Sequence, residues 1–215
     1  MTSTIHSDLS DNKRTITEQE IFWAGEFGEA YTQRNQVDPT SRKPFFHQLL
    51  SLVDGVQSIC EMGANRGHNL AALQQLRPEL HLTGVELNRR AFRDLSKLPG
   101  IASFNCSIQD FPPNATYDLV FTSGVLIHVA PEDLTAIYAK LARLSARYVL
   151  MVEYFNPIPV EVGYRGHSGK LFKRDFASEF LDAVDGWIPT AYGFLWKRME
   201  PAWDNATWTL MKRCA

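Results

Sequence analysis

The stretch Ser58-Ile-Cys-Glu-Met-Gly-Ala-Asn-Arg-Gly-His-Asn-Leu70 decides the fold of this chain. Residues 58–62 form a short apolar run that predicts a buried strand, and Gly63 and Gly67 enclose a turn before an apolar-faced helix. A second strand is predicted at 81–86, and it ends in Glu86, about twenty residues after the turn. Doubly wound folds place a carboxylate at this point to bind a ribose. The spacing therefore indicates a nucleoside site.

The departures from a dinucleotide fingerprint are as informative as the match. That fingerprint requires glycine where this chain has Asn65 and His68, so that a pyrophosphate can rest on the helix N-terminus. Two of the three glycines are missing, which favours a nucleoside without phosphates. S-adenosylmethionine is the commonest cofactor of that kind.

The bulk composition is that of an ordinary globular chain. Its 215 residues are 45% hydrophobic and 21% charged, with a net charge of −2. Such a balance argues against a nucleic-acid partner, and no signal peptide or membrane-spanning run is seen. The three cysteines lack metal-ligand spacing, so no metal is expected. We expect a cytoplasmic protein without a membrane anchor, and the oligomeric state is left open.

The chain divides into three predicted parts. Residues 1–14 are polar and predict a disordered tail. Residues 15–56 predict an N-terminal helical lid, which begins with a capping box from Thr17 to Glu20 and is interrupted at Gly25 and Gly28. Residues 57–215 predict the main domain.

Strands and helices alternate through the main domain, which indicates an α/β fold with a mostly parallel sheet. The last two strand-like runs follow each other directly and predict an antiparallel hairpin at one edge of the sheet. Strands are predicted at 57–62, 81–86, 101–106, 117–123, 147–153, 191–198 and 206–212, and helices at 45–53, 67–77, 88–96, 131–144 and 173–184.

Polar residues follow three of the predicted strands, at the sheet edge where ligands bind. Thr122 to His128 come after the fourth strand, and His128 could be either a ligand-facing group or a structural histidine. Ser107 and Ile108 follow the third strand, where an adenine would be held. Asp110, in contrast, is best interpreted as a turn or cap residue.

Two further segments have alternative interpretations. The insert at 160–175 is rich in glycine and basic residues; Arg165 and Lys170 could bind an anionic substrate, or the insert could be a solvated loop. The aromatic N-terminal segment could be core packing, or it could bring Tyr31 and Arg34 onto a methionine carboxylate.

Together these motifs resemble the class I S-adenosylmethionine-dependent methyltransferases, over roughly residues 45–153. Nearly the whole chain is similar to the methylases associated with pseudaminic acid biosynthesis, through the segments 17–28, Tyr31, Arg34-Asn35, 153–157 and 164–167. The resemblance implies a Rossmann-like sandwich with a seven-stranded, mostly parallel sheet whose last strand is antiparallel.

The resemblance also implies roles for particular residues. Glu86 would bind both ribose hydroxyls, Leu87 would pack on the adenine, and the sulfonium methyl would point toward Ser123, His128 and the 153–170 segment. The expected cofactor-binding set is Trp23, Tyr31, Arg34, Gly63, Ala64, Asn65, Gly67, Glu86, Leu87, Ser107, Ile108, Ser123 and Val125.

A sulfonium is a strong methyl donor, so the protein mainly aligns the acceptor and supplies a base where one is needed. The candidate bases are His128, His167, Glu153 and Tyr164, and the candidate substrate-binding residues are Tyr154, Asn156, Arg165 and Lys170. The expected substrate is a small polar, anionic metabolite, such as a sugar, a sugar nucleotide or an amino-acid-like molecule, methylated on an amino or hydroxyl group.

Other functions fit parts of the pattern. A dinucleotide-dependent oxidoreductase is disfavoured by the missing glycines, and a non-catalytic nucleoside-binding protein is disfavoured by the basic insert. Methylation of RNA is disfavoured by the net charge of −2. Binding of labelled cofactors and a turnover assay would separate these alternatives.

Overall fold

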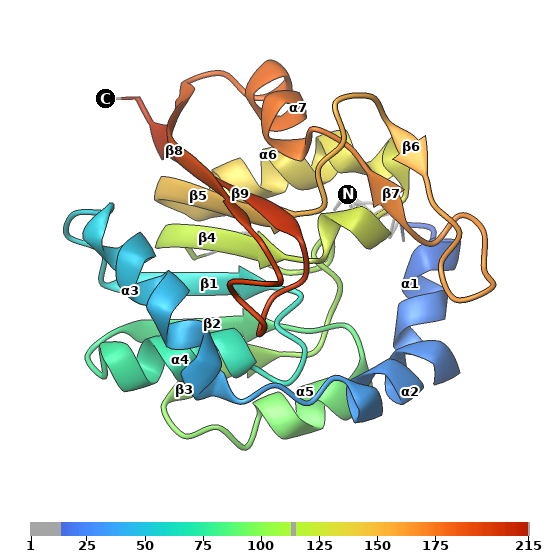
Figure 1. Ribbon diagram of the computed structural model, residues 1–215, viewed down its shortest axis with the longest axis horizontal. Coiled ribbons are helices and arrows are strands. Elements are labelled where there is room, and N and C mark those ends of the chain that lie inside the picture. The colour runs from blue at the N-terminus through green and yellow to red at the C-terminus, as the bar shows by residue number, and fades with distance from the viewer. Residues whose placement is uncertain (1–13, 113–114, 215) are drawn as a thin grey trace, which may run out of the picture.

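The computed structural model describes residues 14–112 and 115–214. Within those ranges seven strands form one sheet in the order β3-β2-β1-β4-β5-β9-β8 (Figure 1). Neighbouring strands from β3 to β5 are parallel, whereas β9 runs antiparallel to both β5 and β8. The predicted α/β fold, with a mostly parallel sheet and an antiparallel last strand, is confirmed.

Strands and helices alternate along the parallel part of the sheet, as the hydrophobic pattern predicts. The strands are β1 (Ser58–Met62), β2 (His81–Val85), β3 (Ile101–Phe104), β4 (Tyr117–Ser123) and β5 (Ser145–Glu153). The helices are α3 (Lys43–Ser51), α4 (His68–Leu76), α5 (Arg89–Leu95), α6 (Leu134–Leu144) and α7 (Phe176–Ala183). The edge hairpin is β8 (Trp187–Leu195) and β9 (Ala206–Arg213).

Each face of the sheet has its own apolar core. On one face, residues of α3 and α4 such as Phe46 and Leu73 pack on Ile59 of β1. On the other face, residues of α6 and α7 such as Tyr138 and Phe180 form a second core with Val149 of β5. Apolar burial on both faces of the sheet drives the layered arrangement. The helices cover the two faces and leave the carboxyl ends of the parallel strands open to a ligand.

Two short N-terminal helices, α1 (Glu18–Ala24) and α2 (Glu26–Arg34), lie beyond those carboxyl ends (Figure 1). The predicted capping box is present, because Thr17 and Glu20 exchange hydrogen bonds at the start of α1. Gly25 separates the two helices. Gly28 has no side chain, which lets α2 pack against the end of α1: a Cβ at this position would lie 1.8 Å from the main-chain oxygen of Trp23. The predicted break in this helix is confirmed.

Some boundaries differ from the prediction. The edge strand β8 begins at Trp187 instead of residue 191, and the helix predicted from 173 begins at Phe176, after Asp175, whose side chain accepts from the Ser178 main-chain N–H. The insert also contains a small hairpin, β6 (Val160–Glu161) with β7 (Phe172–Lys173), which alternation alone did not predict.

The disordered tail predicted at 1–14 lies outside the described residues, apart from Arg14. Its guanidinium pairs with Glu20 at 2.7 Å and with Asp110 at 2.8 Å.

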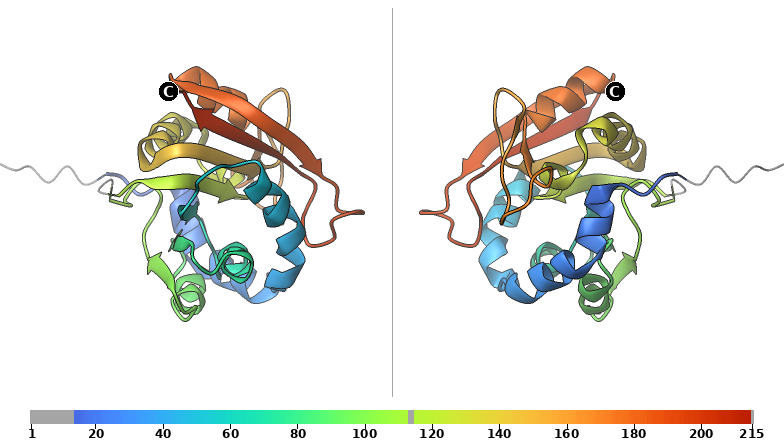
Figure 2. Two further views of the ribbon diagram at one scale, coloured as in Figure 1. Left: turned by 90° about the vertical axis from the view of Figure 1, so that its left-hand side faces the viewer. Right: turned by 90° about the vertical axis from the view of Figure 1, so that its right-hand side faces the viewer.

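Viewed from either side, the β8–β9 hairpin and its loop extend past the rest of the sheet (Figure 2). None of the helices in the described part of the chain has the length and apolar character needed to cross a bilayer.

Candidate active site

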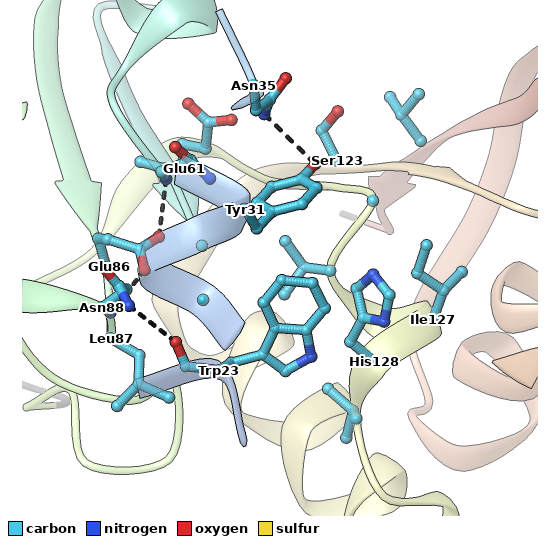
Figure 3. Close-up of a pocket in the computed structure, with 18 of the residues that line it drawn as sticks. Trp23, Tyr31, Asn35, Glu61, Glu86, Leu87, Asn88, Ser123, Ile127 and His128 are labelled. Carbon is cyan, nitrogen blue, oxygen red and sulfur yellow. Dashed lines mark hydrogen bonds between the residues drawn. The ribbon is translucent and has the colours of Figure 1, made fainter. Parts of the chain in front are cut away.

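A cavity of about 620 Å³ opens at the carboxyl ends of the parallel strands (Figure 3). The loops after β1, β2, β3 and β4 form its floor, and α1 and α2 cover it. Its remaining walls come from the 3₁₀ turn Pro39–Arg42, the insert around Tyr164 and the loop between β8 and β9. Segments distant in sequence, from α1 to the β8–β9 loop, thus complete a site that is built around the glycine turn between β1 and α4.

Glu86 is fixed at one end of the cavity. One carboxylate oxygen accepts the main-chain N–H of Asn65 at 2.7 Å, and the other accepts that of Asn88 at 2.6 Å (Figure 3). Asn65 can donate in this way because it adopts a left-handed backbone with φ of 49°. Burial raises the pKa of Glu86, while these hydrogen bonds oppose the rise. Each oxygen keeps a further lone pair, so the carboxylate can accept two ligand hydroxyls.

Gly63 and Gly67 of the turn are each required for a different structural reason. Gly63 lines the cavity with φ of 78°, and a Cβ there would lie 2.5 Å from the Val125 side chain. Gly67 does not line the cavity; a Cβ at this left-handed position would meet Leu95 and Leu98. This position does not support the predicted cofactor contact of Gly67. The missing Cβ instead lets α4 begin close to these leucines.

The loop after β3 brings Ser107 and Ile108 to the cavity as predicted. The Ser107 hydroxyl is already saturated, since it accepts from Arg14 and from the Asp110 N–H and donates to the Asp110 carboxylate. Asp110 is the turn residue that the sequence predicted, with the added ion pair to Arg14. Of these two residues, only Ile108 has a side chain that is free to contact a ligand.

Gln109, which the sequence did not single out, adds a polar group to this loop. It lines the cavity, and its side-chain oxygen is buried without a hydrogen-bond partner among the described residues. An unpaired buried acceptor is costly, so this oxygen is suited to a ligand donor such as an exocyclic amine.

A second set of unpaired atoms lies on the wall formed by β1, α4 and the turn before α3. The Glu61 carboxylate accepts from Asn69 at 2.6 Å, but its other oxygen, the Asn69 oxygen and the Arg42 Nε have no partner within the described chain. Burial raises the pKa of Glu61 to about 8 and lowers that of Arg42 to about 10. Two free acceptors and one free donor are complementary to an α-amino acid group.

Neither Glu61 nor Arg42 was among the predicted site residues. Glu61 stands inside the quoted motif, so its position two residues before Gly63 was a usable signal. Arg42 reaches the site only through tertiary packing: its guanidinium lies 3.7 Å from the centre of the Trp203 ring, which is contributed by the β8–β9 loop.

The N-terminal helices place Trp23 and Tyr31 at the cavity (Figure 3), and Arg34 lines it as well, as expected. Asn88 donates to the Trp23 carbonyl at 2.9 Å, which ties α1 to the loop after β2. Tyr31 accepts from Asn35 at 3.3 Å, and burial raises its pKa to about 12.

The loop after β4 places Ser123, Val125 and His128 at the cavity, and Ala64 and Leu87 line it as well. Glu153 does not reach it: its carboxylate lies under this loop and accepts the N–H of Val125 at 3.1 Å. Burial raises the pKa of Glu153 to about 7. This position does not support the prediction that Glu153 is a catalytic base, because its oxygens hold the loop in place.

The insert places some of its polar residues in the cavity and others outside it. Tyr164 and Arg165 line the cavity, as does Tyr154 just after β5. His167 lies against the outer aromatic rings of α1 and α2, 4.9 Å from Phe22, and not in the cavity. A β-bridge between Tyr164 and His167, with Arg165 and Gly166 at positive φ between them, produces this division.

Lys170 and Asn156 are the other predicted residues that lie away from the cavity. The Lys170 ammonium lies 3.4 Å from the Glu18 carboxylate of α1, and the Asn156 side chain donates to the nearby Ile158 carbonyl. Their predicted substrate contacts, like the predicted role of His167 as a base, are not supported by these positions.

The loop between β8 and β9 was missed by the sequence reasoning. It brings Trp203, Asp204 and Lys197 to the cavity, where Asp204 accepts from the Tyr154 hydroxyl at 2.9 Å and from Lys197 at 2.8 Å. Burial and the neighbouring Asp204 raise the pKa of Tyr154.

Comparison with known proteins agrees with this arrangement. Residues 59–147 match the family model described as a methyltransferase domain. A search of curated proteins gave no match.

Solved structures of similar fold include three methyltransferases. Magnesium protoporphyrin IX methyltransferase from Synechocystis PCC 6803, with bound SAM, has a TM-score of 0.66 at 14% identity, covering 94% of this chain and 100% of that one. An amino pentose methyltransferase from Micromonospora echinaspora, also SAM-bound, gives 0.63 at 13% identity, covering 87% and 96%. A Burkholderia thailandensis 1,6-didemethyltoxoflavin-N1-methyltransferase with S-adenosylhomocysteine gives 0.67 at 12% identity, covering 92% and 87%.

Residues 59–147 thus carry a methyltransferase domain, and the fold around it is the one found in methyltransferase structures solved with bound SAM or S-adenosylhomocysteine.

Proposed function

We propose that this enzyme transfers the methyl group of S-adenosylmethionine to an amino or hydroxyl group of a small polar, anionic molecule. The observation that carries the proposal is the polarity of the cavity. The cavity is lined by the fixed Glu86 carboxylate and also by arginines that pair with no carboxylate among the described residues.

The residues present fit the cofactor. Glu86 would accept the two ribose hydroxyls, Ile108 and Leu87 would pack on the adenine, and Gln109 would accept from its amine. Glu61 and Asn69 would accept from the methionine ammonium. Arg42, beside Glu61, would donate to the methionine carboxylate, and this position favours Arg42 over Arg34 for that task.

Arg34 and Arg165 then remain for the acceptor. Arg34 lies 5.9 Å from the Phe27 ring centre and Arg165 lies 5.9 Å from that of Tyr164, so each guanidinium has an aromatic neighbour and no protein anion in the described residues. A positively charged sulfonium beside two unpaired guanidinium groups is electrostatically unfavourable unless an anion lies between them. This favours an acceptor that carries a carboxylate or phosphate.

The chemistry divides simply between cofactor and protein. Bound S-adenosylmethionine supplies an activated methyl group. The protein would exclude water from the cavity, since α1 and α2 cover it, and would hold the acceptor in line with the bond that breaks. We propose that α1 and α2 act as a lid, within the predicted 15–56 segment.

A sugar or sugar-nucleotide acceptor in the cytoplasm is the finer form of this proposal. The similarity to the methylases associated with pseudaminic acid biosynthesis supports it, and one structural neighbour is named as an amino pentose methyltransferase.

Binding of S-adenosylhomocysteine measured by calorimetry tests the proposal. Glu86→Gln keeps the side-chain shape but removes the charge, and a hydrogen bond to a charged group contributes about 1.5–3 kcal/mol. We expect affinity to fall about tenfold or more. Wild-type protein that does not bind, or a variant that binds equally well, would contradict the assignment.

Acceptor binding is tested separately by screening anionic amino sugars and sugar nucleotides for methylation. Once an acceptor is found, Arg165→Ala should raise its KM and leave S-adenosylhomocysteine affinity unchanged. Lys170→Ala is the matched control, because its side chain lies on α1. Loss of cofactor affinity in Arg165→Ala would assign this arginine to the cofactor instead.

A further inference from the structure

The imidazole of His128 is held in one tautomer. Its Nδ1 lies 2.7 Å from the main-chain oxygen of Lys170. A carbonyl oxygen can only accept, so Nδ1 must carry the hydrogen. Burial lowers the pKa of His128 to about 4, which keeps the ring neutral near pH 7. Nε2 therefore presents a lone pair, and it makes no hydrogen bond to any residue that the structure describes.

This ring lies in the cavity beside the aromatic groups of the covering segments. Its centre is 4.3 Å from that of the Trp23 ring (Figure 3). The centre of the Tyr164 ring is 5.2 Å away. His128 ends the 3₁₀ turn Leu126–His128, and Glu153 fixes the start of that turn by accepting from Val125. The position of the imidazole is thus set from below by a buried carboxylate and from the side by the insert.

The remaining candidate bases are less well placed. Glu153 lies under the loop and His167 lies outside the cavity. Tyr164 does line the cavity, but a phenol oxygen is a weaker proton acceptor than an imidazole nitrogen. Among the four, only His128 combines a place in the cavity with an available lone pair.

We propose that Nε2 of His128 accepts the proton of the methyl acceptor, and that the main-chain carbonyl of Lys170 is the positioning group that fixes this tautomer. The inference rests on the proposed function and deepens it. An acceptor N–H or O–H donates to Nε2 while its lone pair attacks the methyl carbon. The carbon–sulfur bond breaks, its electron pair stays on sulfur, and the acceptor proton moves to Nε2 and then to water.

This arrangement selects the chemical class of the acceptor atom. Nε2 can only accept a hydrogen bond, so the nucleophile must arrive with a hydrogen of its own, as a neutral amine or a hydroxyl. The arrangement also makes the insert part of the reaction centre, because the group that orients the imidazole belongs to the segment that carries Arg165.

Sinefungin provides a test that does not need the natural acceptor. In this analogue an amine-bearing carbon replaces the sulfonium, so the amine points where the methyl group would point and can donate to Nε2. His128→Phe should weaken sinefungin about tenfold, which corresponds to about 1.4 kcal/mol, and leave S-adenosylhomocysteine affinity unchanged. His128→Gln, which restores an acceptor oxygen, should recover part of the sinefungin affinity.

A control variant defines the outcome. His167→Phe should change neither affinity, because this ring lies outside the cavity. Equal losses for both ligands in His128→Phe, or no loss for either, would overturn the proposal. Failure of wild-type protein to bind S-adenosylhomocysteine would instead contradict the proposed function.

Nitrogen-15 NMR of histidine-labelled protein examines the tautomer directly, with the His128 signal assigned by its loss in His128→Gln. We expect a protonated Nδ1 and an unprotonated Nε2 at pH 7. The opposite tautomer, or a charged imidazolium, would overturn the positioning role of the Lys170 carbonyl.

Discussion

Glu61→Gln probes how the cavity recognises the amino acid part of the cofactor. Burial raises the pKa of Glu61 to about 8, so about 90% of the molecules carry a proton on this carboxyl at pH 7. A ligand ammonium bound to the free carboxylate oxygen would lower that pKa by about 1–3 units. At the upper end of this range, binding would release about 0.9 proton per site at pH 7.

Titration calorimetry with S-adenosylhomocysteine in two buffers of different ionisation enthalpy measures this release. At pH 7 the apparent enthalpy of wild-type protein should differ between the two buffers. Glu61→Gln should show no such difference and should bind about tenfold or more weakly, since a charge-assisted hydrogen bond is lost.

Glu86→Gln is the matched control, because it removes a second buried carboxylate of the same cavity. It should weaken binding but keep the proton release. Buffer-independent enthalpy in the wild type, or release that persists in Glu61→Gln, would refute the assignment of the methionine ammonium to Glu61.

Three further predictions concern the scaffold of the site. Gly63→Val should abolish S-adenosylhomocysteine binding in calorimetry and lower Tm, since a Cβ would lie 2.5 Å from Val125 at a positive φ; a variant that binds normally would contradict this. The pKa of Glu153 is about 7 in the folded protein, against 4.5 ordinarily, so the stability that it contributes is complete below pH 4.5 and is lost as the pH rises through 7. In urea unfolding, the free energy of unfolding of Glu153→Gln should therefore decrease over that range by about 3 kcal/mol less than that of the wild type. The same decrease in both proteins would argue against this prediction. Arg14→Ala should lower the free energy of unfolding by about 1 kcal/mol or less, because its pair with Asp110 is partly exposed, and Asp110→Asn should behave alike.

The parts of the fold that sequence predicted well are those set by local pattern. The strands from β1 to β5 are short apolar runs separated by turn residues, and Glu86 follows its strand at a spacing fixed by the connection geometry. Both features depend on residues close together in the chain, so the sequence alone was sufficient for them.

The residues that were missed or misplaced depend on contacts distant in sequence. Arg42 lies at the site because Trp203, far along the chain, stacks on it, and no local pattern signals that contact. Glu153 ends a strand where an exposed carboxylate is expected, but the N–H groups of the preceding loop enclose it. His167 and Arg165 differ by two positions, and the tight bridged turn sends them to opposite sides.

The cover of the cavity also bears on the last step of turnover. Three contacts join α1 to two other segments: Asn88, after β2, donates to the Trp23 carbonyl, and in the insert Lys170 pairs with Glu18 while the Gly169 carbonyl accepts from Gln19. A spent cofactor under this cover leaves only when these contacts open together. We therefore expect product departure to limit the steady-state rate, with a burst in the first turnover and pronounced inhibition by accumulated S-adenosylhomocysteine.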